Sequence, residues 1–208
     1  MPRRSHLLHI LSLALPLLFT MHFLPFSAAA ATNESASTPV GTQTIGFTAG
    51  PFFPLRVGAS QTSKLFGEAI MPSWMVTLTE PIGSGWYQGQ LALGAELIVF
   101  HTSEPITAYG IGFTPKLVYT STAFGRVRPF LEAGGGPVWT DLGGQVPEQP
   151  GQFNFLVWGG AGCSYQLTRA LAVNAGYRFM HISNANTRQP NSGLNFGLPF
   201  LGLSYQGF

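Results

Sequence analysis

A histidine and a serine lie two positions apart at the end of an apolar segment. They are His181 and Ser183, in the stretch ALAVNAGYRFMHIS that covers residues 170–183. If this stretch is a β-strand, residues two apart point to the same face and lie about 6.5–7 Å apart along the strand. A serine hydroxyl beside an imidazole base is a nucleophile suited to acyl transfer. What the pair does depends on the face that carries it, and hence on the fold.

The N-terminal segment predicts export. Arg3 and Arg4 precede a long apolar run, and FSAAAA follows with small residues of the A-x-A type. This order is typical of a cleaved secretory signal peptide, here residues 1–31; an uncleaved membrane anchor is the alternative. The small and polar residues 32–42 are expected to be a linker, and residues 43–208 the folded region.

The composition favours a membrane β-barrel. Charged residues make up 9% of the chain and hydrophobic residues 45%, whereas soluble surfaces are about a quarter to a third charged. No second apolar run of helix length follows the signal peptide. Barrel strands alternate apolar and polar residues and so contain no such run. Without Arg3 and Arg4 the basic and acidic residues balance, which excludes a basic face for nucleic acid.

Aromatic and branched residues alternate with small or polar ones in eight segments, which Gly, Pro, Ser and Asn clusters separate. We therefore predict an all-β fold, an eight-stranded antiparallel transmembrane barrel of the bacterial outer membrane with a lumen filled by side chains. An even strand number returns both termini to the periplasm, with the longer loops outside. The predicted strands cover residues 43–52, 67–79, 87–100, 109–121, 127–140, 153–166, 170–183 and 194–207.

The inward phase of these strands contains charges of both signs. Glu96, Lys116, Arg128 and Glu132 fall on it, and we expect them to form a paired network inside the barrel, because a buried charge needs a partner.

No cofactor is expected. The sequence has no glycine-rich phosphate loop and no metal-ligand cluster, and Cys163 is the only cysteine, which excludes an internal disulfide. Outside the predicted signal peptide the only histidines are His101 and His181. His101 ends a predicted strand and is expected to be an interface or solvent residue.

In residues 170–183 the His181–Ser183 pair continues the phase of Tyr177 and Phe179, whereas Arg178 lies on the inward phase. The pair therefore points outward, toward lipid, near the outer leaflet. Polar groups there cost free energy unless they are hydrogen-bonded or wet. The simpler interpretation is that the strand leaves the membrane near residue 180, where polar residues are ordinary.

The longer stretch HISNANTRQPNSGLN resembles the signature of the lipid A 3-O-deacylases, outer-membrane enzymes of Gram-negative bacteria. The resemblance implies an eight-stranded barrel with an active site on its outer wall. It implies that Ser183 is the nucleophile, that His181 is the base, and that the amide of Asn184 holds the oxyanion together with backbone N–H groups. The matching residues are His181, Ser183, Asn184, Ala185, Pro190, Asn191 and Gly193.

Position 195 departs from that signature, because the acid of the family falls at Asn195. An asparagine can accept a hydrogen bond from the imidazole and fix its tautomer, but it has no charge with which to stabilise an imidazolium. Three alternatives follow: a slower Ser-His-Asn triad, a different acid such as Glu148 in a neighbouring loop, or an inactive relative.

We therefore expect a serine esterase that removes the 3-O acyl chain of lipid A in the outer leaflet, without a cofactor. The alternatives are a latent or non-enzymatic barrel with a structural or adhesive role, another lipid-modifying enzyme such as a phospholipase or acyltransferase, and a soluble secreted β-barrel. The sequence leaves open whether the protein forms a homodimer.

Overall fold

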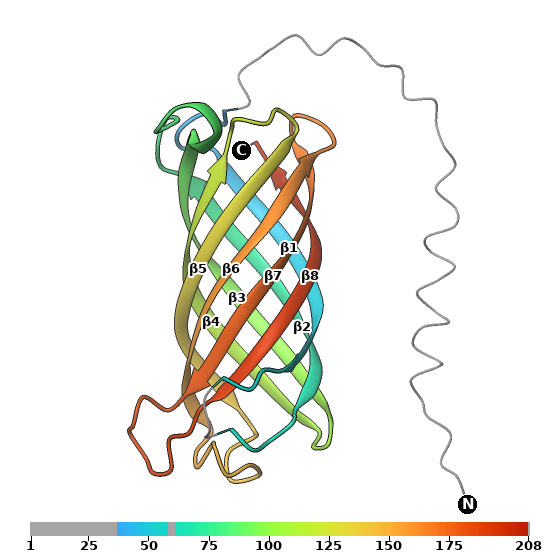
Figure 1. The fold of residues 1–208 in the computed structure, drawn as a ribbon, viewed down its shortest axis with the longest axis vertical. Helices are drawn as coiled ribbons and strands as arrows, with labels where there is room; N and C mark the ends of the chain where they lie inside the picture. The colour runs from blue at the N-terminus through green and yellow to red at the C-terminus, as the bar shows by residue number, and fades with distance from the viewer. Residues whose placement is uncertain (1–36, 58–60, 208) are drawn as a thin grey trace, which may run out of the picture. The chain divides into compact units, whose positions relative to one another are not determined.

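The chain folds into a closed β-barrel. The structure is a computed structural model that describes residues 37–57 and 61–207. Within them, each strand pairs antiparallel with its neighbour in sequence, and β1 pairs with β8 to close the barrel (Figure 1). The strands are β1 (Gln43–Pro54), β2 (Phe66–Thr77), β3 (Gly89–Glu104), β4 (Ala108–Ser121), β5 (Val127–Thr140), β6 (Phe153–Gln166), β7 (Leu171–Ser183) and β8 (Leu194–Gln206).

The predicted eight-stranded antiparallel barrel is confirmed. The predicted signal peptide, residues 1–31, lies outside the described residues and stays a prediction. Of the predicted linker, residues 37–42 are described. The main difference in strand ends is at β3, which continues to Glu104 although the sequence suggested an end at residue 100. The polar residues there keep the alternation of the strand: Thr102 is buried in the lumen and Ser103 is exposed.

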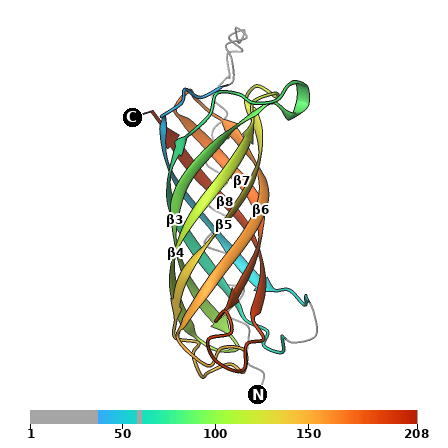
Figure 2. The ribbon, with the colours of Figure 1, turned by 90° about the vertical axis from the view of Figure 1, so that its left-hand side faces the viewer.

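The two ends of the barrel differ in their connections. We call the end that carries Gln43 and Gln206 the terminal end, and the opposite end the loop end (Figures 1 and 2). The loop end carries the connections 55–65, 105–107, 141–152 and 184–193. The expectation that every connection there would be the longer one is wrong for β3–β4. The terminal-end connection 78–88 is longer, because a short 3-10 turn, η1 (Gly85–Tyr87), forms within it.

The outer wall is apolar. Large hydrophobic side chains alternate outward along each strand and are 37–66% exposed, which is the pattern of a wall that faces lipid. Examples from different strands are Phe47, Trp74, Phe113, Leu131, Val157, Phe179 and Leu201. No helix among the described residues is long and apolar enough to span a membrane.

A four-charge cluster crosses the lumen. The guanidinium of Arg178 donates two hydrogen bonds to each of Glu96 and Glu132, at 2.6–3.0 Å. Lys116 Nζ lies 3.0 Å from a carboxylate oxygen of Glu96 and 3.6 Å from one of Glu132. The Arg178 guanidinium also stacks 4.0 Å from the ring centroid of Trp158. The charges balance and each has a partner, as burial requires.

The predicted network is therefore correct for three members and wrong for Arg128. Arg178 takes its place, since it lies level with Glu132. Glu132 pairs with Gly160 on β6, and Gly160 pairs with Arg178 on β7. Gly160 has no side chain between them, and a Cβ there would lie 2.8 Å from Arg178 Cγ. The alternation of a strand gives the direction of a side chain but not its height in the barrel.

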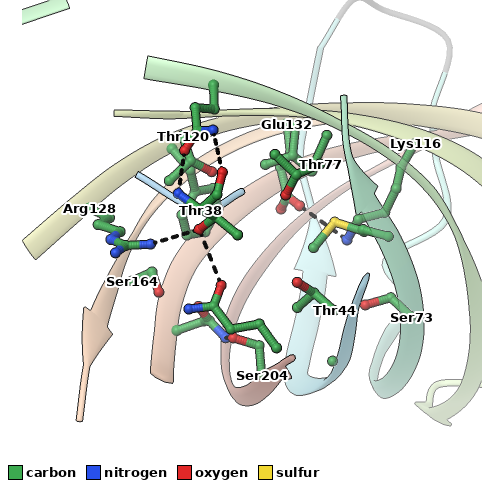
Figure 3. A pocket seen from close by; sticks show the side chains of 18 of the residues that line it. Thr38, Thr44, Ser73, Thr77, Lys116, Thr120, Arg128, Glu132, Ser164 and Ser204 are labelled. Atoms are coloured by element: carbon green, nitrogen blue, oxygen red, sulfur yellow. Dashed lines mark hydrogen bonds and ion pairs between the residues drawn. The ribbon is translucent and has the colours of Figure 1, made fainter. Parts of the chain in front are cut away.

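Arg128 lies nearer the terminal end, at a polar cavity of about 130 Å³ in the lumen. Figure 3 shows Thr38 at this cavity, where its hydroxyl accepts a hydrogen bond from Arg128 Nη1 at 3.3 Å. The Thr38 backbone also exchanges two hydrogen bonds with the Gln90 side chain. The segment that precedes β1 is thereby tied to the inside of the barrel wall.

Candidate active site

The structure places His181 and Ser183 on the outer wall. Near the C-terminal end of β7, the side chains of Arg178, Met180 and Ile182 are buried in the lumen. Those of Tyr177 and Phe179 are exposed at 42% and 37%. His181 and Ser183 continue the outward row and are half-buried. The strand is regular to its end at Ser183, since its pairing with β6 runs without a shift from Ala172 to Ser183. The predicted orientation of the pair is confirmed.

Asn195 is the direct cross-strand neighbour of His181. The β7–β8 register is continuous, and it sets His181 opposite Asn195. Their side chains meet: His181 Nδ1 lies 2.8 Å from Asn195 Oδ1. Pro199 on β8 does not disturb this register, because its pairing with Tyr177 falls in step with the rest. Neighbouring antiparallel strands bring opposed side chains within about 4.5–5.5 Å at Cβ, so the contact follows from the pairing.

The β1–β2 connection fixes the orientation of the Asn195 amide. Asn195 Nδ2 donates to the backbone carbonyl of Val57 at 3.4 Å. Its backbone N–H donates to Gln61 Oε1 at 2.7 Å. Since the NH₂ group faces a carbonyl, the amide oxygen faces the imidazole, and His181 carries its proton on Nδ1. Nε2 is then the unprotonated nitrogen, which is the form that a general base needs.

Gly193 lies against the imidazole ring. Its φ is +68°, a left-handed conformation that glycine adopts without strain. A Cβ at this position would lie 2.5 Å from His181 Cε1 and 3.1 Å from Nε2. The chain therefore needs glycine here for two reasons, backbone conformation and room for the imidazole. Together Gly193 and Asn195 confine the ring from β8 and the turn before it.

Among the described residues, no hydrogen bond joins Ser183 to His181. Ser183 is half-buried, and its direct neighbour on β6 is Phe155. Bonds between a nucleophile and its base are often long without substrate and shorten when substrate binds. Thus two of the three predicted residues, His181 and Asn195, are in contact. Ser183 is the next outward-facing residue of β7 after His181.

Asn184, the predicted oxyanion residue, lies inside the β7–β8 loop. It is 2% exposed, and its Nδ2 donates to the carbonyls of Arg188 at 2.9 Å and Pro190 at 3.4 Å. Its backbone N–H donates to Asn191 Oδ1 at 3.2 Å. The Asn184 donors therefore hold the loop together. The next two residues, Ala185 and Asn186, have φ values of 52° and 63°, which turns the chain sharply away from β7.

Glu148 does not contact His181. Its buried carboxylate accepts hydrogen bonds from the backbone and hydroxyl of Thr62, at 2.6 and 2.9 Å, and from those of Ser63, at 2.8 and 2.6 Å. Burial raises the pKa of this carboxyl, but the bonds from Ser63 and Thr62 outweigh burial and hold the pKa below its usual range. Glu148 thus ties the β5–β6 loop to the connection that orients Asn195, and it does not serve as the replacement acid.

The profile of the family described as lipid A 3-O-deacylase (PagL) matches residues 56–204. The chain belongs to this family. Among solved structures, the barrel is similar to the outer membrane enzyme PagL, with 21% identity and a TM-score of 0.52 over 76% of this chain and 97% of that one.

Neisserial surface protein A (NspA) is also similar in fold, with 16% identity and a TM-score of 0.57 over 79% of this chain and 96% of that one. A comparison with curated proteins gives no match. Identities this low show the fold only. Membership of the PagL family, together with a fold that outer-membrane barrels share, indicates the bacterial outer membrane as the location.

Three of the four connections at the loop end are long, and outer-membrane barrels keep their short turns in the periplasm, so we expect the loop end to face outward. His181 and Ser183 then lie near the outer leaflet, at the boundary between lipid and the loops. Val57 and Gln61, which orient Asn195, gave no signal in the sequence, since they come from a connection distant along the chain. Gly193 was part of the motif, but its contact with the imidazole needed the structure. The described residues contain no cluster of metal-ligating side chains.

Proposed function

We propose that this PagL-family protein is an outer-membrane serine esterase that hydrolyses the 3-O acyl ester of lipid A. Ser183 is the nucleophile, His181 the general base, and Asn195 the residue that orients the imidazole. The observation that carries the proposal is the 2.8 Å contact from His181 Nδ1 to Asn195 Oδ1 on the outward face.

The reaction has two steps. Nε2 of His181 takes the Ser183 proton while Oγ bonds to the ester carbonyl carbon, and the tetrahedral species collapses as the alkoxide of the sugar takes that proton and leaves. Water then attacks the acyl-serine, again giving a proton to Nε2, and Ser183 regains it as the fatty acid departs. The products are the free hydroxyl of lipid A and a fatty acid, with water as the only co-reactant.

Asn195 supports this chemistry through geometry but not through charge. In serine proteases, an asparagine in place of the acid costs about 10⁴ in kcat because it holds the wrong histidine tautomer. Here Val57 turns the NH₂ group of Asn195 away and leaves its oxygen for Nδ1–H. The tautomer is therefore the productive one. What the amide lacks is the negative charge that would stabilise the imidazolium.

Asn184 can serve the oxyanion only in a rearranged loop. Its Nδ2 must first leave the carbonyls of Arg188 and Pro190, to which it donates. We propose that lipid binding against the β7–β8 loop triggers this change. An oxyanion donor is worth about 3–4 kcal/mol in the transition state, which offsets the roughly 1–3 kcal/mol of the two neutral hydrogen bonds that Asn184 gives up.

The location of the site suits a lipid substrate. Tyr177 and Phe179 precede His181 on the outward row of β7, and Val157 lies directly opposite His181 on β6. Acyl chains can pack along these side chains while the ester remains at the height of Ser183. Lipid A thus meets the site without leaving the outer leaflet.

The test is lipid A mass spectrometry in a Gram-negative host that expresses wild-type protein, Ser183→Ala or a matched control, Ser84→Ala. Ser84 is exposed at the terminal end, far along each strand from the site. The proposal expects loss of one hydroxyacyl chain with wild type and Ser84→Ala, and intact lipid A with Ser183→Ala. Intact lipid A with all three, although the barrel is folded in the outer membrane, would instead support a latent or non-enzymatic barrel. Fatty acid released from phospholipid would support a phospholipase.

A further inference from the structure

A second histidine on the outer wall has a cross-strand partner at its Nδ1. His101 of β3 lies opposite Glu68 of β2 in the strand register, and His101 Nδ1 is 2.8 Å from Glu68 Oε1. The ring of Tyr109, opposite His101 on β4, packs against the imidazole in a tilted arrangement, with centroids 4.8 Å apart and planes at 32°. The ring is thus held from both sides, by a carboxylate and by an aromatic face.

A serine follows this histidine at the same spacing as in β7. The segment His101-Thr102-Ser103 in β3 matches His181-Ile182-Ser183 in β7, and both strands run from the terminal end to the loop end. In both, the middle residue points into the lumen: Thr102 is 0% and Ile182 3% exposed. Both histidines are half-buried on the outer wall.

Ser103 is accessible. It is exposed, and it is the extra residue of a β-bulge, since Gly67 pairs with Thr102 and Phe66 with Glu104. Its hydroxyl makes one long hydrogen bond, 3.4 Å to the carbonyl of Phe66. Rotation about χ1 toward His101 costs only this weak bond. Bulges often occur beside active sites, where they re-aim a side chain.

The two sets differ in the residue that faces Nδ1. The contact distance is 2.8 Å in both, but Asn195 is a neutral amide, whereas Glu68 is a carboxylate. Because Glu68 accepts at Nδ1, Nε2 of His101 is left to act as a base. A carboxylate also stabilises the imidazolium that forms when the base takes a proton. In this respect the set on β2 and β3 is the more complete of the two.

We propose that Ser103, His101 and Glu68 form a second esterase site on the outer wall, directed at ester-linked acyl chains of outer-leaflet lipids. The proposal goes beyond the function assigned to Ser183 and does not depend on it. Ser103 Oγ bonds to the ester carbonyl carbon, His101 Nε2 takes its proton and delivers it to the departing alkoxide, and water releases the acyl group as a fatty acid. Tyr109 positions the imidazole.

The simpler interpretation is a surface ion pair stacked on an aromatic ring. Exposed pairs contribute little to stability, and the side chain of Glu68 is 63% exposed. A structural pair would leave Ser103 as unreactive as any exposed serine. Nucleophilicity of Ser103 therefore distinguishes the two interpretations.

The experiment uses a fluorophosphonate probe on the folded barrel in detergent, with labelled serines located by peptide mass spectrometry. An activated serine displaces fluoride from the probe and forms an Oγ–P bond. We expect Ser103 to be labelled about 100-fold faster than Ser84, the typical effect of a positioned base being about 10²–10⁴. Ser84 is an exposed serine in the same digest without a histidine two positions before it, so it serves as an internal control.

Two variants separate activation from mere exposure. Glu68→Gln removes the charge and His101→Gln the base, and each is expected to slow labelling of Ser103 at least about tenfold without changing that of Ser183. Retention of the heat-shifted gel band shows that each variant is folded. Equal labelling of Ser103 and Ser84, or no effect of either variant, would overturn the proposal.

The same experiment distinguishes the proposal for Ser103 from the proposal for Ser183. Labelling of Ser183 alone supports the function proposed for β7 and refutes the second site, and labelling of Ser103 alone does the reverse. To identify the lipid, Ser183→Ala is compared with the double variant Ser183→Ala/Ser103→Ala on vesicles of lipopolysaccharide and of phospholipid. Fatty acid that only the single variant releases identifies the source, and no difference on either vesicle counts against an esterase.

Discussion

Asn195→Asp is the most informative change to the β7–β8 site, because it adds a charge with almost no change of shape. The amide oxygen of Asn195 already lies 2.8 Å from His181 Nδ1, so a carboxylate oxygen can take its place. Hydrogen bonds to charged groups are worth about 1.5–3 kcal/mol and neutral ones about 0.5–1.5. The difference, about 1–2 kcal/mol, appears when His181 becomes an imidazolium, and it corresponds to a rate increase of about 5–30-fold.

Two costs oppose this gain. Asn195 is 6% exposed, so a carboxylate there loses hydration. The second carboxylate oxygen would also face the Val57 carbonyl, to which Nδ2 now donates. Two acceptors repel, so we expect the β1–β2 connection to loosen and stability to fall by about 1 kcal/mol, the value of a typical hydrogen bond. The rate gain should remain, because it concerns the transition state only.

The assay is the single-turnover rate of lipid A deacylation in mixed micelles, from which chemistry is obtained separately from binding. Asn186→Asp is the matched control: it adds the same charge to an exposed position of the neighbouring β7–β8 loop, and aspartate tolerates the left-handed backbone there. An unchanged or lower rate in Asn195→Asp, with the barrel folded and Asn186→Asp like wild type, would refute the argument that the missing charge limits the reaction.

Three further predictions concern the surroundings of the site. Gly193→Ala places a Cβ 2.5 Å from His181 Cε1 and should lower the deacylation rate about 100-fold, whereas Gly144→Ala, equally left-handed but with open space around it, should not. Because the folded state lowers the pKa of Glu148, the tie between the loops is stable above the usual glutamate pKa and is lost as the pH falls through the lowered value. Protease cleavage of the β1–β2 connection should therefore rise only at pH values below the usual glutamate pKa. Glu148→Gln should remove this pH dependence. Arg178→Ala leaves two buried carboxylates with one lysine and should cost about 3–5 kcal/mol in denaturant unfolding. Arg128→Ala loses only a bond to Thr38 and should cost about 1 kcal/mol or less.

The sequence predicted the side of the barrel wall to which a side chain points better than its position along the barrel axis. Alternation along residues 170–183 was enough to turn His181 outward and Arg178 inward, because side chains on a strand alternate strictly. It could not rank Arg178 above Arg128 as the partner of Glu132, since that depends on the stagger between strands, which passes through Gly160. In the same way, the contact of His181 with Asn195 followed from a local motif, whereas the support from Val57 and Gln61 needed the folded loops.

The pair at His101 shows a different limit. Its His-x-Ser spacing is visible in the printed sequence, but the predicted strand ended at His101, which left Ser103 in the loop that follows. The structure extends β3 to Glu104 and leaves both His101 and Ser103 accessible outside the lumen. The position of Glu68 opposite His101 depends on the β2–β3 register, and periodicity within one strand carries no information about that register.

The four-charge cluster also bears on permeability. Arg178, Lys116, Glu96 and Glu132 lie across the lumen, with the guanidinium stacked on Trp158, and the polar cavity on the terminal side ends at these residues. Hydrated ions would have to separate salt bridges among side chains that are 7% exposed or less. Among the described residues, the cluster therefore leaves no open path through the lumen for a hydrated ion. The proposed lipid chemistry on the outer wall and the closed lumen are separated by the thickness of one strand.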